Sequence, residues 1–133
     1  MNRLKGTILR VESAGNVSLV EVTVAGDTFS SMLLETPQSC DYLREGREVV
    51  LLFKDTEVSL ARELSGRLSI RNRATGRVVK INRGAVLTRI ELDYHGFPIA
   101  SLITSRSAQG LDLHEGDEVI WLIKSNEVSL AAV

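Results

Sequence analysis

The sequence predicts an all-β protein that contains the same small five-stranded barrel twice in tandem. Two observations predict this fold: the chain matches itself without a gap when shifted from Gly6 to Gly76, and short segments alternate apolar with polar residues. About 18 of the roughly 63 aligned positions are identical, and a match at one fixed offset indicates duplicated units. We therefore expect two repeats, at residues 1–66 and 67–133.

The strands follow from the alternation within each repeat. Residues 7–11 predict the first strand. Val20, Val22 and Val24 then alternate with polar residues, the period-two pattern of a half-buried strand, and residues 90–94 repeat it. The remaining strands are expected at residues 28–34 and 99–103, at 49–53 and 119–123, and at 58–61 and 128–131.

Each repeat also predicts one short helix between its third and fourth strands. Thr36 and Pro37 suit the N-cap and the first helical position, and residues 104–110 also begin with cap residues. Gly46 and Gly116 then suit turns with positive φ that lead into the fourth strand. Five short strands with one helical turn in this place are typical of a small barrel, so we expect two tandem OB-like five-stranded Greek-key barrels.

Composition narrows the function classes. The chain has 133 residues, a formal net charge of -1 and 5% aromatic residues, which argues against a nucleic-acid binder with a basic, base-stacking surface. No apolar run approaches the roughly 20 residues of a membrane helix, and the first residues do not resemble a signal peptide. Cys40 is the single cysteine, so no disulfide or cysteine zinc cluster is expected. We expect a cytoplasmic protein without a membrane partner.

The candidate site emerges from the differences between the repeats. The second repeat carries hydrogen-bond donors where the first has apolar or acidic groups. These residues, with first-repeat counterparts in parentheses, are Ser69 (none), Arg71 (Met1), Thr104 (Leu34), Ser107 (Pro37) and Ser125 (Asp55); Lys124, which the first repeat shares as Lys54, completes the set. Hydroxyls with one Arg and one Lys, and no added carboxylate, suit a small oxyanion. The free amides at the predicted helix start would add donors, and Asp55 would repel the anion in the first repeat.

Each feature also has a simpler interpretation when taken alone. Residues 69–72 could be a polar linker, residues 124–127 a hairpin turn, and Thr104 and Ser107 only a helix cap. Trp121, in place of Leu51, is interpreted as a core or interface residue. His95 and His114 lack ligand partners at metal spacing and are interpreted as surface residues, and nothing resembles an activated nucleophile, so we do not expect an enzyme.

Four short motifs, in order, resemble those of the molbindins, the Mop or TOBE domains in their tandem form. They are Ser69-Ile70-Arg71-Asn72 followed by residues 75–76, and then residues 103–107, 113–116 and 123–125. The resemblance covers nearly the whole chain, and it implies an OB-like barrel per repeat that binds molybdate or tungstate without catalysis or an organic cofactor. Ile70 departs from the usual Ser-Ala-Arg-Asn motif. The implied ligand contacts are Ser69, Arg71, Thr104, Ser107, Lys124 and Ser125, with Ile70, Asn72 and Lys54 as supporting residues.

The resemblance further implies a homo-oligomer, either a dimer or a trimer, whose sites lie between domains of different chains. Exchange of an edge strand between domains is also expected. The first repeat keeps only Lys54 of the site residues, so a complete site is expected in the second repeat alone. Two alternatives stay open: a tandem OB-fold module that binds nucleic acid or a protein partner, and the ligand-sensing part of a molybdate-responsive regulator or transporter. The chain itself has no helix-turn-helix and no phosphate loop.

Overall fold

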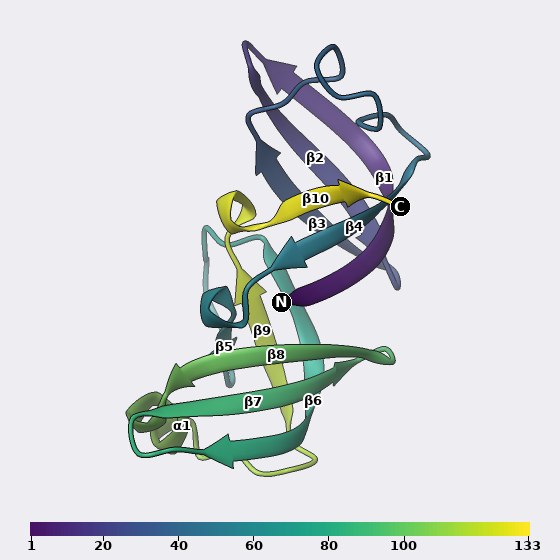
Figure 1. Cartoon of the computed structure of the whole chain (residues 1–133). Coiled ribbons are helices and arrows are strands. Elements are labelled where there is room, and N and C mark those ends of the chain that lie inside the picture. Colours follow the sequence, from purple (N-terminus) through teal and green to yellow (C-terminus); the bar gives the residue numbers. More distant parts are fainter.

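The computed structural model describes all 133 residues and contains two five-stranded antiparallel sheets (Figure 1). In spatial order, the first sheet consists of β10 (Ser129–Ala132), β4 (Glu48–Phe53), β1 (Asn2–Ala14), β2 (Val17–Val24) and β3 (Asp27–Leu33). The second consists of β5 (Ser59–Ala61), β9 (Glu118–Ile123), β6 (Asn72–Arg83), β7 (Leu87–Tyr94) and β8 (Phe97–Thr104). The predicted all-β class with two five-stranded units is confirmed. The only α-helix has seven residues, and no helix is long and apolar enough to span a bilayer.

The two repeats exchange their fifth strands. In Figure 1 the yellow strand β10 lies among the purple and blue strands of the first sheet, beside β4. In the same way, β5 pairs with β9, so that Leu60 lies opposite Trp121. Residues 124–127 therefore do not form a hairpin turn: they contain the 3₁₀ turn η2 (Ser125–Glu127), which leads out of one sheet and into the other. The sheets consequently do not coincide with residues 1–66 and 67–133, whose boundary as sequence repeats stays a prediction.

Each sheet curves toward a barrel. The register of β1 shifts at Leu9 and that of β6 at Val79, and such bulges bend a strand so that it can pair with different neighbours along its length. Two serines at matching positions of the repeats then connect the third strand to the segment before the exchanged strand. The buried Ser31 hydroxyl donates to the Val128 carbonyl at 2.5 Å, and the Ser101 hydroxyl donates to the Val58 carbonyl at 2.7 Å.

The predicted helix is present only in the second repeat, as α1 (Ser105–Leu111). The prediction of a helix at residues 36–40 is wrong: this segment is a turn in which the Ser39 and Cys40 N–H groups donate to the Thr36 carbonyl. The Ser39 hydroxyl accepts the Thr36 N–H at 2.9 Å, and the segment closes this single turn without continuing into a helix. Thr36 aligns two residues beyond Thr104, the N-cap of α1. The segment between this cap and the buried Leu43 is therefore two residues shorter than the one that forms α1 in the second repeat.

A single hydrophobic core joins the two halves. Trp121 of the second sheet is fully buried and stacks between Phe29 and Phe53 of the first sheet, with ring centroids 5.4 and 5.8 Å away. Tyr94 packs edge-on against Trp121, and its hydroxyl donates to the Asp27 carboxylate at 2.6 Å. Burial and then this hydrogen bond raise the pKa of Tyr94 well above its usual range. The interpretation of Trp121 as a core and interface residue is confirmed.

Candidate oxyanion site

A cavity of about 360 Å³ lies where three segments from both halves meet. Strand β3 contributes Met32, the segment before β6 contributes Ser69, Ile70 and Arg71, and the end of β9 with η2 contributes Lys124, Ser125 and Asn126. The structure thus brings together four of the six predicted contact residues, along with Ile70. These four form two pairs, Ser69 with Arg71 and Lys124 with Ser125, which are more than fifty residues apart in sequence, so the convergence of the pairs is a property of the fold.

Asn72 fixes the segment that carries Ser69 and Arg71. Its side chain is 1% exposed, and its carboxamide pairs with the backbone of Ser30 on β3 in the manner of a neighbouring strand. The Ser30 N–H donates to Asn72 Oδ1 at 2.7 Å, and Asn72 Nδ2 donates to the Ser30 carbonyl at 2.8 Å. The Ser30 hydroxyl also lies 2.5 Å from the Ser125 hydroxyl. Asn72 therefore holds Arg71 against the other half, and its carboxamide bonds to Ser30 rather than lining the larger cavity.

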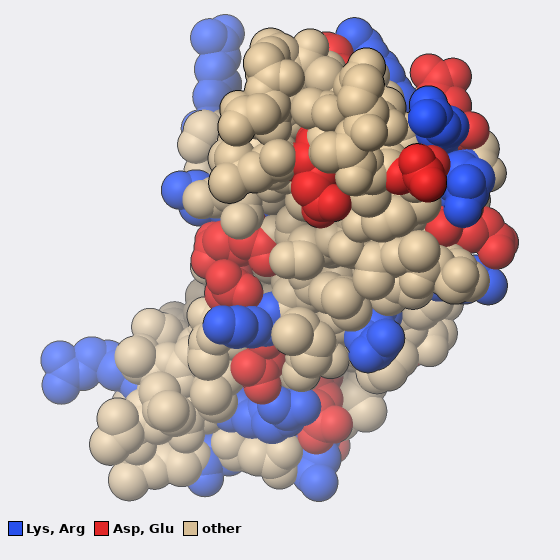
Figure 2. Space-filling model, turned by 45° about the horizontal axis from the view of Figure 1, so that its top comes forward, with Lys and Arg blue, Asp and Glu red and all other residues tan.

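The cavity has a positive lining without a carboxylate. Arg71 and Lys124 form no ion pair and no side-chain hydrogen bond, and none of the lining residues is acidic. Elsewhere the charges are mixed: Figure 2 shows acidic and basic residues interspersed on the face drawn, without a continuous basic surface. Two free cations beside serine hydroxyls give an oxyanion both charge and directed donors.

A second, smaller cavity of about 170 Å³ shares Ser69, Arg71 and Ser125 with the first. Its lining also includes Glu21 and Thr28. The Glu21 carboxylate would repel an anion there, so the larger cavity is the better candidate.

The corresponding junction of the other half is closed. Asn2 pairs with the backbone of Ala100 on β8 at 2.9 and 2.8 Å, just as Asn72 pairs with Ser30. However, Asp55 stands in the place of Ser125, and Arg89 Nη1 on β7 donates to its carboxylate at 2.6 Å. The same scaffold therefore forms a cavity lined by two free cations on one side and an ion pair on the other.

The sequence profile of the TOBE domain matches residues 1–60 and residues 68–130. The chain belongs to the TOBE domain family. Because the two matches lie in tandem, this result confirms the resemblance to the tandem Mop/TOBE proteins, the molbindins.

Several similar proteins are named for molybdenum. The chain is 43% identical to the molybdenum-pterin-binding protein MopB of Rhodobacter capsulatus over 67% of this chain and 34% of MopB. It is 34% identical to MopA of the same organism over 98% of this chain and 50% of MopA. It is also 34% identical to the molybdenum import ATP-binding protein ModC of Brucella abortus over 68% of this chain and 26% of ModC. The chain thus spans at most about half the length of these relatives.

The fold is also that of a solved structure. The cytoplasmic molybdate-binding protein ModG, with molybdate bound, superposes with a TM-score of 0.92 and 31% sequence identity, covering 99% of this chain and 96% of the other. The likeness extends to both halves of the TOBE chain.

Three predicted residues lie away from the cavity within the chain. Thr104 caps helix α1: its hydroxyl oxygen accepts the Ser107 N–H at 3.1 Å, and its hydroxyl donates to Ser107 Oγ at 2.8 Å. Both side chains are exposed. Lys54 is also exposed, and it precedes the 3₁₀ turn η1 (Asp55–Glu57) at the closed junction.

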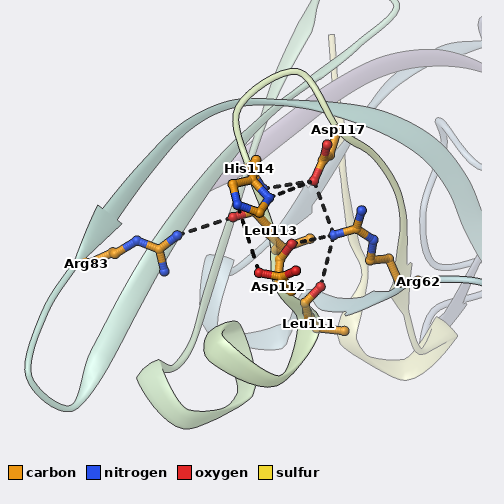
Figure 3. Close-up of polar contacts among 7 residues, drawn as sticks. All are labelled: Arg62, Arg83, Leu111, Asp112, Leu113, His114 and Asp117. Carbon is orange, nitrogen blue, oxygen red and sulfur yellow. Dashed lines mark hydrogen bonds and ion pairs between the residues drawn. The ribbon is translucent and has the colours of Figure 1, made fainter.

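A polar cluster anchors the start of the linker that ends at Arg71. Figure 3 shows Arg62, which follows β5, reaching the loop after α1. Its Nη1 donates to the carbonyls of Leu111 and Asp112 at 3.0 and 2.6 Å and pairs with the Asp117 carboxylate at 3.2 Å. This contact ties the exchanged strand β5 to the second half at the point where the linker begins.

The structure places acidic side chains beside His114, for which the sequence predicts no partner at metal spacing. The His114 ring lies 3.9 Å from Asp112 and 3.7 Å from Asp117. The side chain is 68% exposed, as expected of a surface residue, and the chain has no group of three or more His, Cys, Asp or Glu side chains that could hold a metal ion.

The turn that carries Lys124 and Ser125 ends in a perturbed carboxyl group. The pKa of Glu127 is raised, first by burial and then by a hydrogen bond and charge repulsion from Glu57, while Lys124 acts in the opposite direction. Glu57 and Glu127 occupy matching positions of the two repeats, so the duplicated turns η1 and η2 face each other through their glutamates.

Sequence reasoning missed Met32, Ser30 and Arg89. A signal for two of them was available: at the repeat offset, Ser30 aligns with Ala100 and Leu19 with Arg89, so each is a polar residue opposite an apolar one. Met32 aligns with Leu102, and nothing in that pair of apolar residues indicates a cavity.

Proposed function

We propose that this chain binds molybdate, or the closely similar tungstate, in the cavity between its halves, without catalysing a reaction. The observation that carries the proposal is the convergence of the unpaired Arg71 and Lys124 with Ser69 and Ser125 in a cavity without a carboxylate. The relatives named for molybdenum and the molybdate-bound ModG support the choice of ion. The bare oxyanion, rather than an organic cofactor, suits a lining whose polar groups are mainly small donors.

The cellular role that fits such a binder is storage, buffering or sensing of the oxyanion in the cytoplasm, the location named for ModG. Thr104 and Ser107 are proposed to reach the anion from a second protomer of a dimer or trimer, because both are exposed and lie away from the cavity of their own chain. Light scattering coupled to size-exclusion chromatography, with and without molybdate, tests the assembly. A strictly monomeric complex with the ion would contradict the contribution of these two residues.

The alternative of a nucleic-acid module lacks a supporting observation. Phe29, Phe53, Tyr94 and Trp121 are buried in the shared core, and the remaining two aromatic residues are half-buried, so no exposed ring is available to stack on bases. A gel shift with single-stranded oligonucleotides should be negative.

Calorimetric titration of the whole chain tests the proposal. Molybdate and tungstate should give saturable heats, and Arg71→Ala should weaken binding at least about tenfold, because a charge-assisted donor is lost. Arg73→Ala is the matched control, since Arg73 is exposed two residues further along and does not line the cavity. If the unsubstituted chain gives no heat with either ion, the proposed function is wrong.

A further inference from the structure

The backbone of β3 supplies an unpaired edge at the cavity. Both backbone groups of Ser30 bond to Asn72, so they point away from the neighbouring strand β2. In an antiparallel sheet the backbone groups of successive residues point alternately to the two sides of the strand. The N–H and C=O groups of Met32, two residues beyond Ser30, therefore point to this same outer side.

No strand pairs with Met32 on that side, because β3 is the last strand of its sheet. Met32 lines the larger cavity together with Arg71 and Lys124. Its outward N–H therefore faces a site whose other polar groups are hydroxyls and cations. An edge amide without a partner is a strong donor for an oxyanion, and such charge-assisted bonds are about twice as strong as neutral ones.

We propose that the backbone N–H of Met32 donates a hydrogen bond to the bound oxyanion, so that the first repeat of the same chain adds a donor to the site of the second. The inference rests on the proposed function and adds a donor that no side-chain motif reveals. Asn72 sets the geometry. It directly follows Arg71, and its pairing with Ser30 fixes the position of Arg71 relative to Met32.

The other half of the molecule supplies a way to remove this donor. Pro98 lies in the edge strand β8, two residues before Ala100, whose backbone pairs with Asn2 on the outer side. Pro98 thus occupies an outward-facing edge position, where proline is tolerated because no ladder hydrogen bond is lost. Met32→Pro should likewise remove only an outward N–H, and Met32→Ala controls for the side chain.

Thr28→Pro is the matched control for the backbone change. Thr28 aligns with Pro98, faces the same outer edge, and lines only the smaller cavity. In calorimetry with molybdate, Met32→Pro should lose affinity roughly 10- to 100-fold, the effect of one lost hydrogen bond to a charged group. Met32→Ala keeps the backbone N–H and should lose less affinity than Met32→Pro, and Thr28→Pro should bind within about twofold of the unsubstituted chain.

A second measurement uses the unsubstituted chain. In a ¹H–¹⁵N NMR titration with molybdate, the Met32 amide proton should move downfield and saturate together with the calorimetric signal, while the Thr28 amide moves little. If Met32→Pro folds and binds like the unsubstituted chain, the inference is wrong. If that variant does not fold, a Met32 amide that stays unmoved in NMR overturns the inference instead. Absence of any molybdate binding by the unsubstituted chain would refute the proposed function. Molybdate binding that neither shifts the Met32 amide nor is weakened by Met32→Pro would refute this inference alone.

Discussion

The two junctions between the halves of this TOBE chain share the same asparagine-to-backbone pairing but differ in the charges that surround it. At both, an asparagine side chain pairs with the backbone of an edge strand: Asn72 with Ser30, and Asn2 with Ala100. One junction leaves Arg71 unpaired beside a cavity, and the other neutralises Arg89 with Asp55. The comparison teaches that duplication conserved the scaffold, while a few side chains determine whether a junction can receive an anion.

Transferring the closed junction's carboxylate to the open one should have the largest effect. Ser125→Asp places an acidic group beside Arg71 and Lys124, where it repels the anion and pairs with the cations that would bind it. Molybdate affinity should fall by more than about 100-fold, on the order of 3 kcal/mol. Calorimetry measures this loss, with Ser125→Ala as the smaller, neutral change. Equal affinities for Ser125→Asp and Ser125→Ala would show that charge at this position does not matter.

The two asparagines, Asn72 and Asn2, allow the positioning of Arg71 to be tested separately from the stability of the fold. Asn72→Ala and Asn2→Ala should each lower the free energy of unfolding by about 1–3 kcal/mol, because each leaves buried backbone groups without partners. Only Asn72→Ala should also weaken molybdate binding, since only Asn72 adjoins the segment with Arg71. Urea denaturation and calorimetry on both variants test this distinction. A loss of affinity in Asn2→Ala as large as that in Asn72→Ala would count against it.

The smallest expected effect concerns the facing glutamates of η1 and η2. Because the folded state raises the pKa of Glu127, its neutral form stabilises the fold at low pH, and this stability is lost as the pH rises through the raised value. Glu127→Gln should therefore match the unsubstituted chain near pH 4 and be more stable near pH 7.5, by less than about 1 kcal/mol. Thermal unfolding at the two pH values measures the difference. The exposed Glu115→Gln is the control, and a Glu127→Gln difference that does not depend on pH would refute the account.

Much of the fold can be predicted from the sequence because the pattern of each strand occurs twice, once in each repeat. Val20, Val22 and Val24 predict β2, and their counterparts predict β7, at the places where the structure has them. The strand exchange could not be predicted from strand patterns, since residues 57–61 and 127–131 are identical and either fifth strand suits either sheet. The helix at residues 36–40 was predicted from its cap residues, Thr36 and Pro37. In the structure these residues begin a single turn, in which the Ser39 hydroxyl accepts the Thr36 N–H.

The candidate site was likewise predicted only in part from the sequence. Side-chain differences between the repeats identified Ser69, Arg71, Lys124 and Ser125, which line one cavity. The contribution of β3 was not predictable, because a backbone amide has no sequence signature and becomes a donor only when its strand lies at the edge of a sheet. The placement of Thr104 and Ser107 against a second protomer stays a prediction.

The most direct test of the difference between the junctions compares the two lysines that the repeats share. Lys124 lines the cavity, and Lys54 holds the matching position at the closed junction. Calorimetric titration of Lys124→Ala and Lys54→Ala with molybdate should show a loss of about tenfold or more for Lys124→Ala and affinity close to that of the unsubstituted chain for Lys54→Ala. Equal losses in the two variants would contradict the account, because they would mean that both junctions bind the anion.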